Sequence, residues 1–478
     1  MNRPQGLKKF WLLLALAALC AVTVAAQDSP APLTAADRIY FLMTDRFADG
    51  DPANDQNVLR SDPSAYHGGD FQGIIDKLDY IRDLGFTAVW ISPVVANQFR
   101  GYHGYWASDF YRTNEHFGSL AKLKELVAAA HARGLKVLAD LVVNHTGLLH
   151  PWVGEPEYES WFHPRRTIAN WNDQREIEDG WLAGLPDLNQ ENPAVREYLI
   201  TMAQWWIRET GIDGYRLDTV RHVPQEFWRE FAAALKKEFP GFYLIGEVWD
   251  GRPDFVAGYQ RAGLDGLVDF PIYYAIHDVF AGDRPGARLA QLIRECAAVY
   301  PDRSRMGTFI DNHDVPRFVS QVHNLRDERL RQALAFLMTY TGIPILYYGT
   351  EIGLDGGADP DNRRDMDWQV RSPLTDYIKK LNAIRAANPA LTQGDLTLLP
   401  DRPDFFGYTR SFESNRILTV FNLANQKRRV ELELPEGWGE PGSILRGLTG
   451  SENYRLRRGK LQLQLAPRQV NLFRCESK

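Results

Sequence analysis

The sequence repeats one local pattern eight times. From about residue 38 onward, short apolar runs alternate with stretches of helical period such as residues 71–85 and 120–134, each of which ends in glycine. Apolar residues at helical spacing followed by glycine are typical of an amphipathic helix and its end. The β-type runs span residues 37–43, 87–93, 136–143, 214–218, 242–248, 266–271, 306–311 and 343–349. Eight β-then-α units favour a closed parallel (β/α)8 TIM barrel, and a doubly wound open sheet is the alternative on pattern alone.

Two stretches depart from this alternation. Residues 146–186 have no sustained period and are rich in tryptophan and charge, and they are longer than a strand-to-helix loop requires. We expect a small inserted domain there, between barrel segments 34–145 and 187–394. Residues 395–478 alternate apolar and polar side chains over short runs separated by turn signals. This pattern predicts a C-terminal antiparallel β-sandwich.

The first 26 residues have the composition of a secretory signal peptide. Arg3, Lys8 and Lys9 precede an apolar run that begins at Phe10, and small residues occupy positions 24–26. The run is short for a spanning helix, so an uncleaved anchor is the weaker alternative. We expect a secreted or periplasmic protein with no membrane span in the mature chain.

Charge and cysteine content exclude several classes of function. Cleavage after residue 26 removes three positive charges and no acids, which moves the formal charge from −6 to −9. An acidic surface argues against nucleic acid or another polyanion as ligand. Cys20 leaves lipid attachment open, although Leu19 before it is bulkier than such processing usually accepts. Cys296 and Cys475 are too few for a disulfide framework or a cysteine metal site, and the sequence does not tell whether they pair.

Polar residues close four of the predicted strands. In a barrel of this kind the C-terminal ends of the strands carry the active site, so residues at these positions are the candidates for catalysis. They are Asp140, Asn144 and His145 after the third strand, Arg216 and Asp218 on the fourth, Glu247 on the fifth, and His313 and Asp314 after the seventh. Each alone has a structural explanation, such as an ion pair or a bond to a backbone carbonyl. Several carboxylates at one barrel mouth are unfavourable unless one of them titrates usefully, and glycoside hydrolysis uses such a set.

The neighbours of these acids suggest different roles for them. Arg216 lies two residues before Asp218 on the same face of the strand, where its charge would keep Asp218 ionised as a nucleophile. Glu247 precedes Val248 and Trp249, apolar neighbours that we expect to raise its pKa toward that of a proton donor.

The third acid and two histidines have supporting roles on this interpretation. Asp314 is expected to hold sugar hydroxyls and favour the distorted ring. His145 and His313 are expected to donate hydrogen bonds to those hydroxyls as charge develops in the transition state.

Five motifs in order resemble the signature regions of the α-amylase family of glycoside hydrolases, family 13. They are DLVVNH, LPDLN, GYRLDTVRH, GEVW and FIDNHD, and the resemblance runs from about residue 36 to the C-terminus. It implies a (β/α)8 barrel, an inserted domain B at 146–186, a C-terminal β domain and a retaining double displacement on α-linked glucose. It also implies Asp218 as nucleophile, Glu247 as acid/base and Asp314 as transition-state stabiliser.

The same resemblance implies a set of sugar contacts. Arg216, His145 and His313 match first-sugar contacts, and Tyr105 in GYHGYW matches an aromatic beneath that sugar, for which core packing is the alternative. The remaining implied contacts are His103 and Trp106 beside Tyr105, Asp359 and Arg363 toward a distant sugar on the non-reducing side, and Arg221 and His222 near the leaving group.

Calcium is a further implication of the family. Asn144, Asp187 and the carbonyl of His222 match positions that bind Ca2+ between the barrel and domain B, and such oxygen ligands suit this ion. The divergent insert does not reveal a domain B ligand. A second candidate loop resembles one in cyclodextrin glucanotransferases, and a solvated acidic turn is the alternative explanation. Its residues are Asp49, Asp51, Asn54, Asp55, Gly68 and Asp70.

Three functions remain open within this resemblance. The amylase-like sequence TVRH after Asp218, the LPDLN motif and the predicted signal peptide favour an α-amylase that cleaves α-1,4 bonds of starch or maltodextrin. A cyclomaltodextrinase, neopullulanase, maltogenic amylase or 4-α-glucanotransferase is the alternative with the same mechanism. A non-catalytic carbohydrate-binding relative is remote, because all three carboxylates are present. The expected partner is an α-glucan or maltooligosaccharide.

Overall fold

The computed structural model describes residues 32–436, 438, 443–456 and 460–476. The predicted signal peptide, residues 1–26, lies outside this part of the chain. Within the described part, every helix is too short or too polar to cross a membrane.

Eight parallel strands form the central sheet, as the sequence predicts. Their spatial order is β8-β7-β6-β5-β2-β1-β10-β9, and a parallel bridge between Val268 and Gly307 joins the two ends of this order. The sheet therefore closes into a barrel, which excludes the open doubly wound alternative. The strands are β1 (Ile39–Leu42), β2 (Ala88–Ile91), β5 (Lys136–Leu141), β6 (Gly214–Leu217), β7 (Tyr243–Gly246), β8 (Gly266–Leu267), β9 (Gly307–Thr308) and β10 (Ile343–Tyr347).

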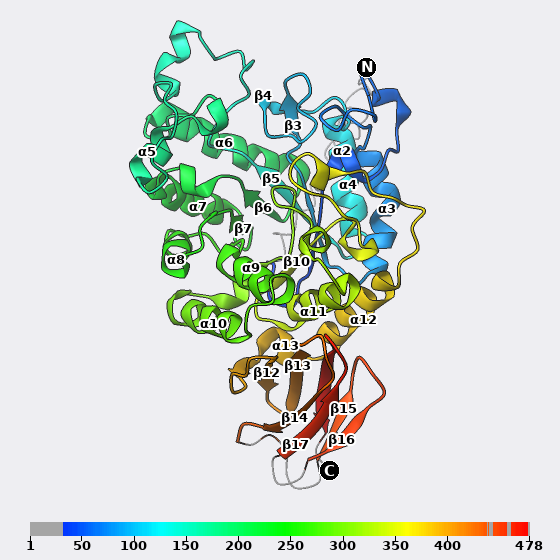
Figure 1. The fold of residues 1–478 in the computed structure, drawn as a ribbon. Helices are drawn as coiled ribbons and strands as arrows, with labels where there is room; N and C mark the ends of the chain where they lie inside the picture. The colour runs from blue at the N-terminus through cyan, green and yellow to red at the C-terminus, as the bar shows by residue number, and fades with distance from the viewer. Residues whose placement is uncertain (1–31, 437, 439–442, 457–459, 477–478) are drawn as a thin grey trace, which may run out of the picture.

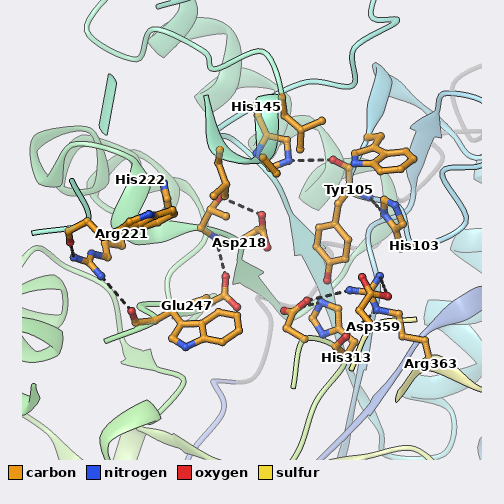
Figure 2. A pocket seen from close by; sticks show the side chains of 18 residues that line it. His103, Tyr105, His145, Asp218, Arg221, His222, Glu247, His313, Asp359 and Arg363 are labelled. Atoms are coloured by element: carbon orange, nitrogen blue, oxygen red, sulfur yellow. Dashed lines mark hydrogen bonds and ion pairs between the residues drawn. The ribbon is translucent and has the colours of Figure 1, made fainter. Parts of the chain in front are cut away.

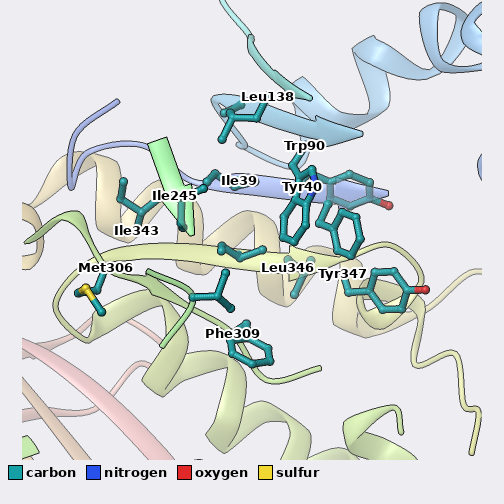
Figure 3. Packing of buried hydrophobic residues seen from close by; sticks show 14 of the residues in the cluster. Ile39, Tyr40, Trp90, Leu138, Ile245, Met306, Phe309, Ile343, Leu346 and Tyr347 are labelled. Carbon is teal, nitrogen blue, oxygen red and sulfur yellow. The ribbon is translucent and has the colours of Figure 1, made fainter. Parts of the chain in front are cut away.

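Burial on both faces explains the composition of these strands. All four residues of β1, β2, β6 and β7 are buried, because the inner face packs inside the barrel and the outer face packs against helices. Figure 3 shows side chains such as Ile39, Trp90, Leu138 and Tyr347 packed among the strands. Near-continuous apolar runs are therefore required, and they were visible in the sequence.

Helices follow the strands and cover the barrel (Figure 1). Side-chain caps start several of them: Asp70 accepts a hydrogen bond from the N–H of Gly73, and Ser119 accepts one from Lys122. The longer helices are α3 (Phe71–Asp83), α4 (Leu120–His131), α6 (Pro193–Thr210), α7 (Gln225–Glu238), α8 (Pro253–Arg261), α9 (Phe270–Ile276), α10 (Ala287–Val299), α11 (Arg326–Thr339) and α12 (Pro373–Ala387).

Two excursions leave the barrel at the C-terminal side of its strands. The first, which sequence reasoning did not anticipate, is the hairpin of β3 (Val95–Asn97) and β4 (Ala107–Thr113) after β2. The second lies between β5 and α6 and includes the expected insertion. It contains η2 (Pro156–Trp161), α5 (Gln174–Asp179) and η3 (Leu182–Gly184), and bridges from His145 to Asp187 and from Phe162 to Leu188 draw its two ends together.

The C-terminal region is a β-sandwich, as expected, and Figure 1 shows it as a separate unit next to α11, α12 and α13 (Ala390–Gln393). A six-stranded sheet of order β11-β12-β13-β18-β15-β16 faces a two-stranded sheet of β14 and β17. The strands are β11 (Asp395–Leu398), β12 (Phe405–Phe412), β13 (Asn415–Asn422), β14 (Arg428–Glu433), β15 (Ile444–Gly447), β16 (Asn453–Arg455), β17 (Lys460–Leu465) and β18 (Val470–Glu476).

Side chains from both sheets fill a second hydrophobic core. Cys475 lies in this core and Cys296 in the barrel core, and both are free thiols.

Candidate active site

Arg216 is the centre of the charged cluster at the barrel mouth. The register of β5 and β6 sets Asp140 directly opposite Arg216, and Nη1 of Arg216 contacts both oxygens of Asp140 at 3.0 Å. The same Nη1 lies 2.6 Å from Oδ1 of Asp218, and Nη2 lies 2.6 Å from Oε1 of Glu247. One buried guanidinium therefore holds three carboxylates, where the sequence had suggested a pair.

Thr219 makes a second link between Asp218 and Glu247. Its backbone N–H donates to Oε2 of Glu247 at 3.1 Å, and its hydroxyl donates to Oδ2 of Asp218 at 3.1 Å. The residue has a left-handed conformation with φ of 47°, which is rare for a β-branched side chain and costs about 1–3 kcal/mol. Asp218 and Glu247 are thus held close together by two separate bridges.

The protonation of Glu247 follows from its burial. Loss of solvent raises the pKa of this carboxyl from 4.5 to about 8, although the charge of Arg216 opposes the shift. Burial likewise raises the pKa of Asp140 to about 7. Glu247 is therefore mainly protonated at neutral pH, as a proton donor must be.

The third predicted catalytic acid, Asp314, lies in a different setting. Arg363 Nη2 contacts its Oδ1 at 3.1 Å, and His313 Nε2 lies 3.2 Å from its Oδ2. Arg363 also pairs with Asp359 through Nη1 at 3.1 Å, so the structure brings together the pair expected from the DPDNRRDM segment.

Tyr105 lines the site and contacts Asp140 and His313. Its hydroxyl donates to Oδ2 of Asp140 at 2.8 Å, and its ring stacks on His313 with centroids 5.2 Å apart. Gly104 permits the sharp turn before Tyr105, because its φ is +91° and a Cβ there would lie 2.5 Å from the carbonyl of Pro93. His145 Nε2 lies 3.1 Å from the carbonyl oxygen of Tyr105.

The histidines of the site are neutral hydrogen-bonding groups. Burial lowers the pKa values of His103, His145 and His313, and it lowers that of His222 to about 4. A neutral imidazole donates one N–H and accepts at the other nitrogen, which suits contacts with hydroxyl groups.

These groups surround a cavity of 590 Å³, a size typical of small-molecule sites. Figure 2 shows their side chains converging from several strand ends. Of the thirteen residues expected to act in catalysis or sugar binding, twelve line the cavity, and Arg216 is buried and is not among the lining residues. The lining ones are His103, Tyr105, Trp106, His145, Asp218, Arg221, His222, Glu247, His313, Asp314, Asp359 and Arg363.

Comparison with known families agrees with this geometry. The family model described as "Alpha amylase, catalytic domain" matches residues 41–389, which is most of the chain. The chain belongs to the α-amylase family. Its members are glycosidases, so the protein is a hydrolase of this class.

Similar proteins cover both the barrel and the C-terminal domain. A solved Anoxybacillus α-amylase is 46% identical with a TM-score of 0.89, over 93% of this chain and 98% of that one. An α-amylase from Geobacillus thermoleovorans, solved with acarbose, is 41% identical with a TM-score of 0.87, over 93% and 99%. A curated "Beta/alpha-amylase" from Paenibacillus polymyxa is 39% identical over 91% of this chain, which spans 37% of that longer protein.

Sequence reasoning missed part of this amylase-family cavity. Trp171 in the insertion and Trp249 after β7 line it and are 50% and 44% exposed. Arg221 joins them, because Nη2 donates to the carbonyl of Trp171 at 2.9 Å and Nη1 to that of Trp249 at 3.4 Å. The tryptophan-rich insertion was a signal for Trp171. The other missed lining residues are Leu182, Ala183, Leu185 and Thr219.

The residues expected to bind calcium behind the site fit an ion of this kind. The bridge from His145 to Asp187 brings Asn144 and Asp187 to one place. Oδ1 of Asn144 and Oδ1 of Asp187 are both buried without a hydrogen-bond partner. Burial raises the pKa of Asp187 to about 7, a cost that a bound cation would relieve. Two orphaned oxygens are the donor type that Ca2+ prefers.

The second candidate loop fits less well. Asp70 accepts from the backbone N–H groups of Gly50 and Asp51 and from the side chain of Asn54, and Asp49 pairs with Arg60 at 2.6 Å. Asp55 Oδ1 and Asn54 Oδ1 are buried without a partner, and a Cβ on Gly68 would lie 2.6 Å from that oxygen of Asp55. Two oxygens of this loop are therefore available to bind an ion, whereas the carboxylates of Asp49 and Asp70 already have hydrogen-bond or ion-pair partners in the protein.

Proposed function

We propose that the enzyme hydrolyses α-1,4-glucosidic bonds in starch, maltodextrin or related α-glucans with retention of configuration. The observation that carries this proposal is the double bridge of Arg216 and Thr219, which holds a carboxylate and a mainly protonated carboxyl side by side. Closely spaced carboxyl groups are the arrangement of retaining glycosidases, in which one of them attacks the sugar directly.

In the first step, an oxygen of Asp218 attacks the anomeric carbon while Glu247 gives its proton to the glycosidic oxygen. The bond to the leaving sugar chain breaks, and the covalent bond to Asp218 forms. In the second step, Glu247 takes a proton from water, the water oxygen attacks the same carbon, and the bond to Asp218 breaks. Arg216 contacts both acids throughout and keeps them in reach of one carbon atom.

Other residues would stabilise the distorted sugar between these steps. Asp314, braced by Arg363, faces the cavity and would accept hydrogen bonds from sugar hydroxyls. His145 and His313 would donate to the same sugar, and the Tyr105 ring would lie beneath it. The contact with the carboxylate of Asp314 gains strength as positive charge develops on the sugar in the transition state.

Trp171 and Trp249, which line the cavity, would hold the part of the sugar chain on the leaving-group side. Arg221 joins the two tryptophans through their backbone carbonyls, so the insertion and the loop after β7 form one surface. Whether water or another sugar accepts the glucosyl group depends on this surface.

We also propose that Asn144, Asp187 and the carbonyl of His222 hold a calcium ion between the barrel and the insertion. The orphaned oxygens of Asn144 and Asp187 support this assignment. When bound, the ion would supply structural cross-linking and no reacting group. The loop of residues 49–70 is a weaker candidate for a second ion.

Export through a cleaved signal peptide is a separate proposal, which rests on residues 1–26 alone. Amino-terminal sequencing of protein recovered outside the cytoplasm should begin at Gln27. A mature protein that still starts at Met1 would contradict it.

A product profile tests the proposed substrate. Purified enzyme is incubated with soluble starch, pullulan, β-cyclodextrin and maltotriose, with Asp218→Asn as inactive control. We expect internal cleavage of starch to be fastest and the control to be inactive on all four. Faster cleavage of β-cyclodextrin would identify a cyclomaltodextrinase instead, and an active control would reject Asp218 as nucleophile.

A further inference from the structure

A second polar cluster, made of two residues of the insertion and one that follows it, lies outside the catalytic cavity. His163 Nε2, a carboxylate oxygen of Asp179 and one of Glu191 all lie within 4.8 Å of one another. Nε2 is 3.8 Å from Oδ1 of Asp179 and 3.9 Å from Oε2 of Glu191. The His163 side chain is only 7% exposed, and this nitrogen has no hydrogen-bond partner. A buried ring nitrogen thus points between two carboxylates without touching either.

The other side of the imidazole is fixed. Nδ1 of His163 lies 2.7 Å from Oδ2 of Asp187, and the His163 backbone is held by its N–H bond to the Asp187 carbonyl and by the Trp181 indole. A histidine that binds a metal usually donates its other ring N–H to a carboxylate, which fixes its tautomer. Nδ1 of His163 faces a carboxylate in this way, and the tautomer that donates from Nδ1 has its lone pair on Nε2.

In each of the two acids, one carboxylate oxygen pairs with Arg175 and the other faces His163. Oδ2 of Asp179 pairs with Nε of Arg175 at 2.8 Å, which leaves Oδ1 toward His163. Glu191 Oε1 pairs with Nη1 of Arg175 at 2.8 Å, while Oε2 faces His163 and accepts a longer bond of 3.1 Å from Arg175. Arg175 therefore orients both acids and still leaves an oxygen of each facing the nitrogen.

We propose that His163, Asp179 and Glu191 form a binding site for a divalent transition-metal ion of the zinc class, distinct from the calcium site. Zinc accepts both imidazole nitrogen and carboxylate oxygen ligands, and three protein ligands with one open position are a common zinc arrangement. Ligand atoms about 2.0 Å from zinc lie about 3.3 Å from one another in a tetrahedron. Nε2 is 3.8 and 3.9 Å from the two oxygens, so small rotations of the carboxylates complete the site.

The ligand chemistry distinguishes this site from the calcium position. Calcium takes oxygen ligands, whereas imidazole suits zinc, copper and nickel. Glu191 is 46% exposed, which gives the ion a route from solvent. Asp187 connects the two sites, because Oδ2 contacts His163 while the orphaned Oδ1 belongs to the proposed calcium ligands. Zinc at His163 would therefore fix the carboxylate that calcium uses.

Cobalt spectroscopy tests this proposal without reference to activity. The full-length enzyme is stripped of metal, reloaded with saturating Ca2+ and titrated with Co2+, whose visible absorption reports nitrogen ligation and tetrahedral geometry. We expect one equivalent to bind with this absorption, to be displaced by Zn2+ and to be unaffected by excess Ca2+. His163→Asn retains an amide donor near Asp187 but lacks Nε2, and it should weaken binding at least about 100-fold.

Two further variants keep the result interpretable. Glu191→Gln changes a side chain that is 46% exposed, so we expect the fold to be retained, and it should weaken Co2+ binding at least about tenfold. His323→Asn removes an exposed histidine elsewhere, and it should leave the affinity unchanged. Absence of Co2+ binding, displacement by Ca2+, or unchanged affinity in both His163→Asn and Glu191→Gln would overturn the proposal.

Discussion

Replacing Glu247 by glutamine separates proton donation from the other tasks of the site. With a pKa of about 8, about 90% of Glu247 is protonated at pH 7, whereas an acid of pKa 4.5 would be about 0.3% protonated. The buried setting thus raises the population of the acid form about 300-fold. General acid catalysis contributes about 10²–10⁴-fold, so Glu247→Gln should lower kcat/KM on maltooligosaccharides by that factor.

The leaving group provides the matched control for this variant. Fluoride departs without a proton, so kcat/KM on α-maltosyl fluoride, which reports the first step, should fall less than about tenfold. Because Glu247 also activates the water of the second step, kcat on the fluoride should fall and the glycosyl-enzyme should accumulate. Stopped-flow and steady-state kinetics on both substrates measure these values. An equal loss of kcat/KM on both substrates would refute the role of Glu247 as proton donor.

The same pKa predicts two pH dependences with definite signs. Wild-type kcat/KM on maltooligosaccharides should fall as pH rises through about 8, and the fluoride should show no such limb. The folded-state pKa lies above the unfolded value, so the protonated carboxyl stabilises the fold fully below about pH 4.5, and this contribution is lost as pH rises toward 8. Glu247→Gln lacks this loss. Its melting temperature should therefore rise relative to that of the wild type between pH 4.5 and 8. A constant difference between the two melting temperatures over this range would contradict the shifted pKa.

Three other substitutions or treatments give separate checks. Asp140→Asn weakens the anchor of Arg216 and should lower the free energy of unfolding by about 3 kcal/mol and kcat at least about tenfold, and an unchanged denaturant midpoint would reject that role. Trp249→Ala removes one wall of the leaving-group side and should lower kcat/KM on maltotriose about tenfold with little change in melting temperature; equal activity would place the sugar elsewhere. Chelation with excess EDTA should lower the melting temperature and added Ca2+ should restore it, whereas an unchanged melting curve would count against structural calcium.

The barrel and its strand-end acids could be predicted because their signals are local. A strand buried on both faces is mostly apolar, so β1, β2 and β7 are visible as runs, and a polar residue that ends such a run stands out. The parallel barrel then places Asp218, Glu247 and Asp314 at one mouth. The pairing of Arg216 with Asp218 follows from their spacing on one strand.

Other features depend on contacts between distant segments, which no local pattern reveals. The contact of Arg216 with Glu247 requires β6 and β7 to be neighbours in a known register. Thr219 is left-handed, against the preference of a β-branched residue, and it contacts acids that follow two different strands. His163 lies in an aperiodic segment, and its neighbours Asp179 and Glu191 are far along the chain. Its environment became visible only in the folded structure.

Trapping the glycosyl-enzyme tests the central assignment most directly. The enzyme is incubated with a 5-fluoro-α-glucosyl fluoride, in which the ring fluorine slows the second step, and the digested protein is mapped by mass spectrometry. We expect one added fluoroglucosyl group per chain, on the peptide that contains Asp218 and attached to that residue. A label on Glu247 or Asp314, or rapid turnover with a first product of inverted configuration, would contradict it.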